Sequence, residues 1–193
     1  KVLNDVSYTF KEKTIYGLHG INGSGKTMLL RLIAGLIVPT EGEVYWNNKK
    51  LHEDISFPGN VGIVIENMEM LPQYTAKQNL SILSKLKNIA DESDIENALK
   101  RVGLDAAAYL KVKKYSLGMK QRLNIAQAIF EKQDLILLDE PTNALDEDGV
   151  KLIYDIVKEE KERGATILIA THHKDDLANM CDVLINVRAG RIY

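Results

Sequence analysis

The sequence predicts an α/β fold built around a mainly parallel β-sheet, with helices on both of its faces. Residues 135–138 and 166–170 are uninterrupted apolar runs, which are typical of parallel strands buried on both faces. Such runs alternate along the chain with stretches of helical periodicity, the order in which parallel strands are connected. Polar and glycine-rich segments that follow these strands are therefore expected at the carboxyl edge of the sheet, where α/β folds bind their ligands.

Composition narrows the class of protein. The chain has 193 residues, of which 45% are hydrophobic and 27% are charged, so it can bury one sizeable core and is neither disordered nor fibrous. A formal net charge of -2 provides no general basic field, so we expect no nucleic acid partner.

The single cysteine, Cys181, cannot form an intrachain disulfide, which favours a reducing compartment such as the cytoplasm. The sequence has no apolar run near the roughly 20 residues that span a bilayer, so membrane association would come through a partner. The chain begins at Lys1 without a signal-peptide pattern, and we expect a trimmed or partly ordered N-terminus.

The first third of the chain predicts strands around a glycine-rich loop. Apolar residues alternate with polar ones over 6–10, which predicts a strand, and a charged turn leads into a second strand over 14–18. After the loop, the apolar spacing predicts a helix that ends near Gly35. Two further strands are expected over 44–46 and 61–65.

The region 67–122 predicts a helical insert. Thr75 with Gln78 and Ser93 with Glu96 have the spacing of capping boxes. Two apolar stripes follow these boxes, and the second ends at Gly103. Their members are Leu80, Leu83 and Leu86, and then Ile95, Leu99 and Val102.

The last third returns to alternating strands and helices. A helix is expected from near Ser116 to 129, followed by the buried strand 135–138, a helix over 147–163, the strand 166–170, a strand over 183–185 and a turn at 189–190. We therefore expect one domain with two subdomains. Residues 1–66 and 123–193 are expected to form a core subdomain, and 67–122 a helical subdomain.

The segment GINGSGKT at 20–27 fits the phosphate-loop pattern G-x-x-x-x-G-K-[ST]. It has the required strand before it and helix after it, which a glycine-rich turn with an exposed lysine would not need. Backbone N–H groups of the loop would surround phosphate oxygens at the helix N-terminus. The expected nucleotide-binding residues are Asn22, Gly23, Ser24, Gly25, Lys26 and Thr27, of which Thr27 would also ligate Mg²⁺.

Two acidic residues follow the buried strand 135–138. Asp139 is placed to hold Mg²⁺, and Glu140 is placed to orient and deprotonate an attacking water. Seen alone, adjacent acids at a strand end can be solvated turn residues. Beside a phosphate loop, they predict catalysis of ATP hydrolysis.

These motifs together resemble the nucleotide-binding subunit of an ABC transporter. The phosphate loop and the helical insert are followed, in the order of that family, by YSLGMKQR, LILLDEPTNALD and ILIATHH. The resemblance implies a P-loop NTPase (RecA-like) core with a mainly parallel sheet, a small antiparallel β portion and an α-helical subdomain. It also implies a head-to-tail homodimer, or a pair with another nucleotide-binding subunit, that holds ATP and Mg²⁺ between the phosphate loop of one subunit and the signature motif of the other.

Four residues take roles from this resemblance. Ser116 and Gly118 match the signature residues that face the γ-phosphate across the dimer, although in isolation this Ser-x-Gly is more typical of a helix cap. Asp146 matches the aspartate of the loop that contacts the partner subunit, and it can also cap the helix 147–163. His172 matches the switch histidine near the γ-phosphate, with His173 as the alternative.

The sequence departs from the usual family pattern at three places. Glu66 stands where most relatives have glutamine, and its carboxylate would still ligate Mg²⁺. The signature YSLGM replaces the usual LSGGQ. These two departures resemble the branch of bacterial exporters for bacitracin and lantibiotic-type peptides, including self-immunity systems. The aromatic residue that stacks on adenine falls before Lys1, so we expect these 193 residues to bind ATP with weakened affinity.

The resemblance thus implies an ATP-hydrolysing subunit that powers an exporter of antimicrobial peptides or drugs. A transmembrane permease subunit would hold it on the cytoplasmic, inner face of the cell membrane. The segment with Met68, Leu71 and Tyr74 is expected either to contact that permease or to pack the core of the helical insert.

Two other classes of function remain open. A soluble ABC ATPase would act on DNA, ribosomes or assembly complexes, and such proteins carry long coiled coils or a second nucleotide domain, which this sequence lacks. A nucleotide sensor without useful turnover is the other class. The complete set of Lys26, Asp139, Glu140 and His172 argues against a sensor.

Overall fold

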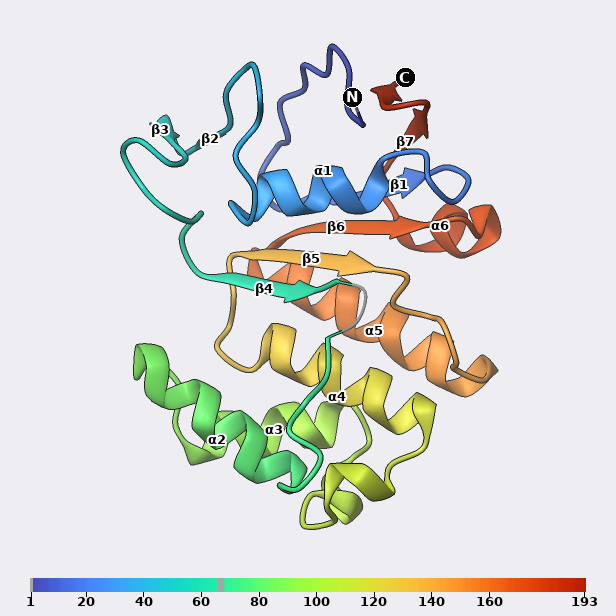
Figure 1. Ribbon diagram of the computed structural model, residues 1–193. Helices are drawn as coiled ribbons and strands as arrows, with labels where there is room; N and C mark the ends of the chain where they lie inside the picture. Colours follow the sequence, from blue (N-terminus) through green and yellow to red (C-terminus); the bar gives the residue numbers. More distant parts are fainter. Residues whose placement is uncertain (1, 66–67) are drawn as a thin grey trace.

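The computed structural model describes residues 2–65 and 68–193, and in this part of the chain it shows a six-stranded sheet with helices on both faces (Figure 1). The strand order is β4-β5-β6-β1-β7-β8, in which the first five strands are parallel and β8 pairs antiparallel with β7. The bounds are β1 Ile15–His19, β4 Val61–Val64, β5 Leu135–Asp139, β6 Thr166–Thr171, β7 Val183–Arg188 and β8 Arg191–Ile192. The predicted α/β class is confirmed.

The two faces of the sheet pack against different helices. In β5, Leu135 and Leu137 belong to one apolar cluster, whereas Ile136 and Leu138 belong to another. The first face is covered by α1 (Lys26–Ile33), and the second by α4 (Leu117–Ile129), α5 (Glu147–Arg163) and α6 (Lys174–Met180), as Figure 1 shows. Burial on both faces explains why these strands read as uninterrupted apolar runs.

The helical segment between β4 and α4 lies beyond the second face of the sheet (Figure 1). It contains α2 (Ala76–Lys87), α3 (Glu92–Arg101) and the short 3-10 turns η1 (Asp105–Ala107) and η2 (Val112–Lys114). Its buried side chains belong to the same apolar cluster as that face. Because α4 runs across the expected boundary after residue 122, this helix joins the helical segment to the sheet.

The predicted ends of these helices are largely confirmed. The Thr75 hydroxyl accepts the backbone N–H of Gln78, and the Gln78 side chain accepts the N–H of Thr75, which closes a capping box. After α3, Gly103 has a φ of 66°, the left-handed conformation that glycine adopts readily. The stripe before it is buried at Ile95, Leu99 and Val102.

Two details of the helical segment contradict the sequence prediction. The capping box of α3 is formed by Asp91 and Asp94, not by Ser93 and Glu96. A carboxylate accepts the free N–H groups of a first turn as well as a hydroxyl does, so the same spacing two residues earlier is used. Leu86 is 78% exposed, because each step of three residues falls short of a full helical turn and the third leucine has rotated away from the core.

The predicted strand over 6–10 is wrong, because this segment pairs with no strand of the described sheet. Val6 and Phe10 pack instead against the apolar cluster of the first face. The ring of Tyr8 lies 4.7 Å from that of Phe10, which meets the buried Tyr16 ring edge-on at 4.9 Å. The alternating pattern therefore reflects a half-buried segment that packs onto the sheet and does not extend it.

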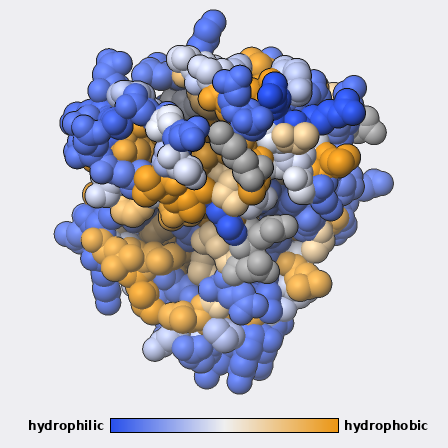
Figure 2. Space-filling model, turned by 45° about the horizontal axis from the view of Figure 1, so that its top comes forward, coloured by the Kyte–Doolittle hydropathy of each residue, from blue (hydrophilic) through white to orange (hydrophobic). Residues whose placement is uncertain are grey.

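A small antiparallel ribbon and the molecular surface complete the fold. The ribbon pairs β2 (Tyr45–Trp46) with β3 (Lys49–Lys50), of which only the first was predicted. Figure 2 shows hydrophobic patches separated by hydrophilic residues on the face that it presents. Among residues 2–65 and 68–193, no helix is long and apolar enough to cross a membrane.

Candidate functional site

The sequence motifs meet at one edge of the sheet. Strands β1, β5 and β6 are parallel neighbours, so the segments after Leu18, Leu138 and Ala170 emerge on the same side. These segments are the phosphate loop, the acidic pair and the histidine pair. Glu66 follows β4, but it lies outside the described residues, so its expected role in holding Mg²⁺ stays a prediction.

The phosphate loop turns sharply because its glycines adopt conformations closed to other residues. Gly23 and Gly25 have φ values of 79° and 113°. A Cβ at Gly20 would lie 2.2 Å from the carbonyl oxygen of Val187 in β7, so only glycine fits between the loop and that strand. Within the loop, Ser24 donates its N–H to the carbonyl of Ile21, and α1 begins directly after Gly25.

Lys26 lies folded inside this loop. Its side chain is buried, and Nζ donates to the carbonyl oxygens of Gly20 at 2.7 Å and Ile21 at 3.3 Å. The buried hydroxyl oxygen of Ser24 has no hydrogen-bond partner in the described part of the chain. A buried cation and an unsatisfied hydroxyl at a helix N-terminus form an environment suited to an anion such as a phosphate.

Thr27 and Asp139 join the loop to the end of β5. The Thr27 hydroxyl donates to Oδ2 of Asp139 at 2.6 Å, and Asp139 is 5% exposed. Hydroxyl and carboxylate oxygens are the ligands that Mg²⁺ prefers, and this ion usually takes few of them from the protein and the rest from water and phosphate. This pair is therefore able to hold Mg²⁺ without a cluster of three acidic residues or histidines, and the described residues contain no such cluster.

Glu140 is held at its carboxylate by three donors. The Thr171 hydroxyl donates to Oε2 at 2.7 Å. The backbone N–H of His172 donates to Oε1 at 3.1 Å, and Nδ1 of the same residue lies 2.8 Å from that oxygen. Thr171 also accepts the N–H of His173 at 3.1 Å, so its own proton is directed to Glu140. A carboxylate that only accepts hydrogen bonds is in the form that can take a proton from water.

The histidine pair at the end of β6 has two distinct environments. His172 contacts Glu140 with its ring. His173 contacts the Thr171 hydroxyl through its backbone and occupies the N-cap position of α6 without a capping hydrogen bond from its side chain. The two imidazole rings lie 3.9 Å apart between centroids. The geometry therefore favours His172 as the residue that acts beside Glu140, the choice made from the sequence.

The signature residues Ser116 and Gly118 lie at the start of α4. Ser116 caps α4 and accepts the N–H of Met119 at 3.2 Å. A Cβ at Gly118 would lie 3.0 Å from the carbonyl oxygen of Ala144, so α4 approaches the loop before α5 closely. Asp146 caps α5 by accepting the N–H of Gly149 at 2.9 Å. Both serine and aspartate thus have the capping role that the sequence also allowed, and within the described chain neither is joined to the phosphate loop by a hydrogen bond.

Sequence reasoning missed two residues that contact Glu140. Thr171 was visible as a polar residue at the end of an apolar strand, which is a usable signal for a site residue. Gln121 on α4 donates its side-chain amide to the carbonyl oxygens of Glu140 at 3.3 Å and Pro141 at 3.0 Å. This contact joins residues far apart in sequence, and no local pattern indicated it.

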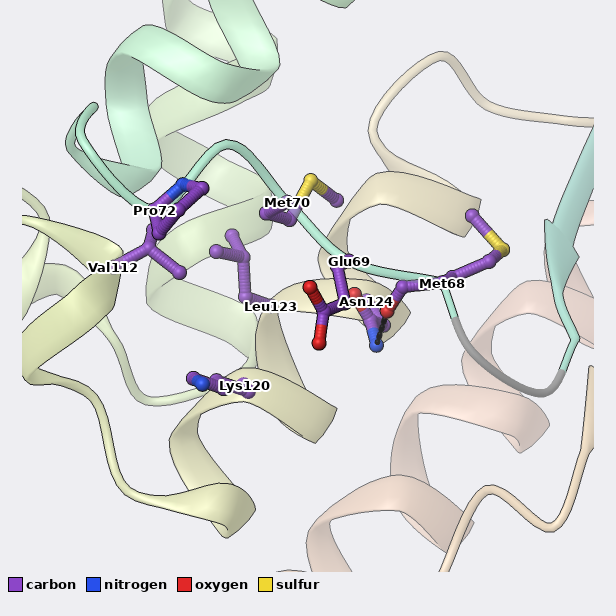
Figure 3. Close-up of a pocket in the computed structure, with 8 residues that line it drawn as sticks. All are labelled: Met68, Glu69, Met70, Pro72, Val112, Lys120, Leu123 and Asn124. Carbon is purple, nitrogen blue, oxygen red and sulfur yellow. Dashed lines mark hydrogen bonds between the residues drawn. The ribbon is translucent and has the colours of Figure 1, made fainter.

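A small cavity lies where the segment after residue 67 crosses α4 (Figure 3). Figure 3 shows Met68, Glu69 and Met70 running past Lys120, Leu123 and Asn124 of the helix. The backbone beyond this point is fixed by the buried Asn79, which accepts the N–H of Leu71 at 2.8 Å and donates to its carbonyl at 3.1 Å. Leu71 and Tyr74 are 43% and 38% exposed, so they do not pack the core of the helical segment.

Known proteins match this chain over most of its length. The family model described as ABC transporter matches residues 3–143. YybJ of Bacillus subtilis (strain 168), an uncharacterized ABC transporter ATP-binding protein, is 60% identical over 99% of this chain and 88% of its own length. The bacitracin transport ATP-binding protein BcrA of Bacillus licheniformis is 35% identical over 100% of this chain and 63% of its own length. The lantibiotic transport ATP-binding protein SrtF of Streptococcus pyogenes is 31% identical over 99% of this chain and 82% of its own length.

Solved structures of similar proteins have the same fold as this chain. The dimeric structure of MJ0796, a bacterial ABC transporter cassette, has a TM-score of 0.90 and 29% identity, and the match covers 99% of this chain and 88% of that chain. A second dimeric structure of MJ0796 shows a post-hydrolysis state bound to ADP and Pi, and it matches with the same TM-score. The chain spans less than two thirds of the length of BcrA.

Proposed function

This chain belongs to the ABC transporter family of ATP-binding proteins, and we propose that it is the MgATP-hydrolysing subunit of a bacterial exporter of antimicrobial peptides or drugs. One observation carries the proposal. The phosphate loop, the pair of Thr27 and Asp139, and the triply held carboxylate of Glu140 converge at one edge of the sheet. Within one subunit, these are the groups needed to bind a nucleoside triphosphate and to activate a water molecule beside it.

The phosphate loop binds the nucleotide in this proposal. Backbone N–H groups at the start of α1 meet the phosphate oxygens, because the helix dipole favours negative charge there. Lys26 exchanges its two backbone acceptors, Gly20 and Ile21, for the β- and γ-phosphates. The lysine then becomes a counter-charge to the phosphates and no longer closes the loop.

Thr27 and Asp139 would hold Mg²⁺, with Glu66 as the further ligand predicted from the sequence. A hydrogen bond of 2.6 Å joins the oxygen atoms of the first two residues, so both lie close enough to bind one small, hard cation in its place. When bound, this ion supplies neutralisation of the negative charge on the β- and γ-phosphate oxygens.

Glu140 orients the attacking water and takes its proton, so that the water oxygen bonds to the γ-phosphorus as the bond to ADP breaks. His172 and Thr171 keep the carboxylate aimed by donating to both of its oxygens. On binding of the nucleotide, His172 also meets the γ-phosphate in this account. The contacts of His172 would therefore differ between the ATP-bound and the ADP-bound site.

The complete site requires two subunits. MJ0796 forms a dimeric cassette. In a head-to-tail pair of this chain, Ser116 and Gly118 face the γ-phosphate that is bound by the partner, and Asp146 lies at the shared interface. The N-terminus of α4, where Ser116 caps the helix, presents donors of the kind that stabilise such an anion.

The exporter assignment rests on the named relatives. BcrA is a bacitracin transport protein and SrtF a lantibiotic transport protein. We propose a related cargo for this chain, and a transmembrane permease that holds it on the inner face of the cell membrane. Met68, Leu71 and Tyr74 form the proposed permease contact, because the two latter side chains are exposed while Asn79 fixes the backbone beneath them. The division into a core (1–66 and 123–193) and a helical subdomain (67–122) belongs to this proposal, with the subdomain passing motion to the permease.

The test is to isolate the complex that the protein forms in its native cells. A tagged, full-length Glu140→Gln variant is purified from detergent-solubilised membranes with MgATP, and its partners are identified by mass spectrometry. The proposal predicts a polytopic membrane protein near one-to-one stoichiometry. Ribosomal proteins, DNA-bound factors or assembly factors in its place would contradict the proposal and favour a soluble ABC ATPase.

A matched surface variant makes this experiment more specific. Leu71→Asp with Tyr74→Asp, introduced in the Glu140→Gln background, changes only exposed side chains of the proposed permease contact. We expect this variant to keep its MgATP-dependent dimer and to lose the membrane protein. Retention of the membrane protein at full stoichiometry would place the contact elsewhere on the chain.

A further inference from the structure

Gln121 connects the helix that carries the signature motif to the turn that carries Glu140. Its side-chain amide nitrogen lies 3.3 Å from the carbonyl oxygen of Glu140 and 3.0 Å from that of Pro141. Both acceptors are carbonyl oxygens, so only the NH₂ group of the amide fits here, and its two N–H bonds serve one acceptor each.

The backbone at Glu140 is strained and needs such support. Its φ is 48°, a conformation that residues other than glycine adopt at a cost of roughly 1–3 kcal/mol. The N–H of Glu140 donates to Ala170 of β6 at 2.7 Å, and its carbonyl also accepts the N–H of Asn143 at 3.2 Å. The residue is therefore held by β6 at its N–H and its carboxylate, and by α4 at its carbonyl. This turn sets the direction in which the carboxylate leaves the end of β5.

The helix that supplies Gln121 begins at Ser116. Its first turn also approaches the same loop at a second place, where Gly118 lies against Ala144. Ala144 has a φ of 64°, so two strained residues of this loop lie against one turn and a half of α4. A displacement of the start of α4 would thus act on Ala144 through Gly118 and on the backbone of Glu140 and Pro141 through Gln121.

We propose that Gln121 is a positioning residue for Glu140 and that it acts within its own subunit. This inference rests on the proposed function, in which Ser116 belongs to the composite site of the partner's nucleotide while Glu140 serves its own. Gln121 lies five residues after Ser116 on the same helix. Gln121 therefore connects two parts of one subunit. One is the helix that faces the partner's nucleotide through Ser116, and the other is Glu140, the proposed base for the nucleotide of its own subunit.

The chemistry of the contact selects the test variants. Gln121→Glu keeps the shape of the side chain but turns acceptor oxygens toward two carbonyls. Gln121→Leu removes the donor and adds no charge, whereas Gln121→Lys restores a donor at similar reach. Lys158→Leu, at an exposed position of α5, controls for a new leucine on the surface.

The decisive experiment uses mixed dimers of the full-length protein assembled with its permease. Two differently tagged copies are co-expressed, one of which carries Glu140→Gln, so that only one catalytic base remains. Gln121→Leu is placed either in the copy with the intact Glu140 or in the other copy. MgATP turnover and nucleotide dissociation constants are measured for both arrangements, and circular dichroism verifies folding.

We expect turnover to fall about tenfold when Gln121→Leu shares its chain with the intact Glu140, and less than about twofold when the other chain carries it. The nucleotide dissociation constant stays within about twofold in both. Gln121→Glu should cause the same loss of turnover, and it replaces Gln121→Leu as the test if that variant folds poorly. Gln121→Lys should recover most of the rate. Lys158→Leu should match the parent.

Two results would overturn the inference while leaving the proposed function intact. One is turnover equal to that of the parent mixed dimer when Gln121→Leu or Gln121→Glu shares its chain with the intact Glu140. The other is a loss that follows the chain lacking the intact Glu140, since this would mean that Gln121 acts through Ser116 on the partner's nucleotide. Absence of MgATP hydrolysis by the wild-type complex would instead overturn the proposed function, and this inference with it.

Discussion

The Nδ1 atom of His172 lies 2.8 Å from Oε1 of Glu140, and the backbone N–H of the same histidine donates to that oxygen at 3.1 Å. The second carboxylate oxygen accepts the Thr171 hydroxyl at 2.7 Å. These contacts come from the end of β6, the strand beside the one that delivers Glu140. The pairing of two parallel strands thus places the proposed base and its donors together without any loop rearrangement.

Thr171→Val tests whether the hydroxyl positions Glu140. The substitution keeps the volume of the side chain but removes the donor to Oε2, so the carboxylate gains freedom to turn. We expect kcat to fall about fivefold to twentyfold with the ATP dissociation constant nearly unchanged. Steady-state kinetics and equilibrium nucleotide binding check this split, and Thr171→Ser should retain most of the rate. Equal losses in the serine and valine variants would show that packing, not the hydroxyl, matters.

Ser116→Arg tests the composite site. Because the proposed ligand of Ser116 is bound by the partner, an arginine there should leave nucleotide binding by the monomer unchanged and abolish MgATP-dependent dimerisation. Analytical ultracentrifugation in the Glu140→Gln background, combined with binding of a fluorescent ATP analogue, separates the two effects. Loss of binding by the monomer would indicate that the serine acts within its own subunit.

Glu160→Ala tests the polar contact that joins α3 to α5. Glu160 exposes only 3% of its side chain and accepts from Arg101 at 2.6 Å and Arg163 at 2.7 Å. Removal of the carboxylate takes away the buried acceptor that Arg101 and Arg163 share, so we expect a loss of about 2–4 kcal/mol in the free energy of unfolding. Urea denaturation measures this loss. Glu159→Ala is the control, because Glu159 pairs with Arg101 but is 58% exposed, and its removal should cost less than about 1 kcal/mol.

Asp182 should make stability depend on pH. Partial burial raises the pKa of its carboxyl, but the N–H of Ile15 at 2.8 Å and the Lys161 ammonium lower it by more, so the pKa lies below its usual value. A lowered pKa gives stability that is fully present above the unfolded value of about 3.9 and is lost as the pH falls through the folded value.

Asp182→Asn removes the charge while keeping an acceptor for Ile15. The carboxylate is about a third exposed, so solvent screening reduces the effect, and we expect a loss of about 1 kcal/mol at pH 7. The difference from the wild type should shrink as the pH falls below about 4. Urea midpoints measured at a series of pH values test this. A difference that widens toward acid would reverse the assigned sign.

Much of the fold follows from local sequence patterns. The helix over 147–163 was bounded correctly, because Asp146 and Gly164 are strong start and stop signals at its two ends. The strand predicted over 6–10 is wrong, because an alternating apolar pattern indicates which side chains are half-buried but not whether a neighbouring strand is available to pair with. The cap of α3 was missed because Asp91 and Ser93 both have partners three residues on, and spacing alone does not choose between them.

The candidate site divides in the same way. The phosphate loop, Asp139 and Glu140 were proposed as site residues from contiguous motifs that follow strands, and the structure brings these segments to one edge of the sheet. Gln121 was not proposed, because its contact with Glu140 exists only once α4 has packed beneath the sheet. Motif spacing therefore indicates candidate nucleotide-binding groups, whereas the residues that orient them are seen only in the tertiary packing.

The most direct test of the account is the MgATP turnover of the full-length protein against that of its Glu140→Gln variant. The amide keeps the shape of the side chain but cannot accept a proton from water, so we expect turnover to fall by about 100-fold or more. Binding of MgATP should be retained, and the dimer should persist. Near-normal hydrolysis by Glu140→Gln would contradict the assignment of Glu140 as the general base, and with it the central claim.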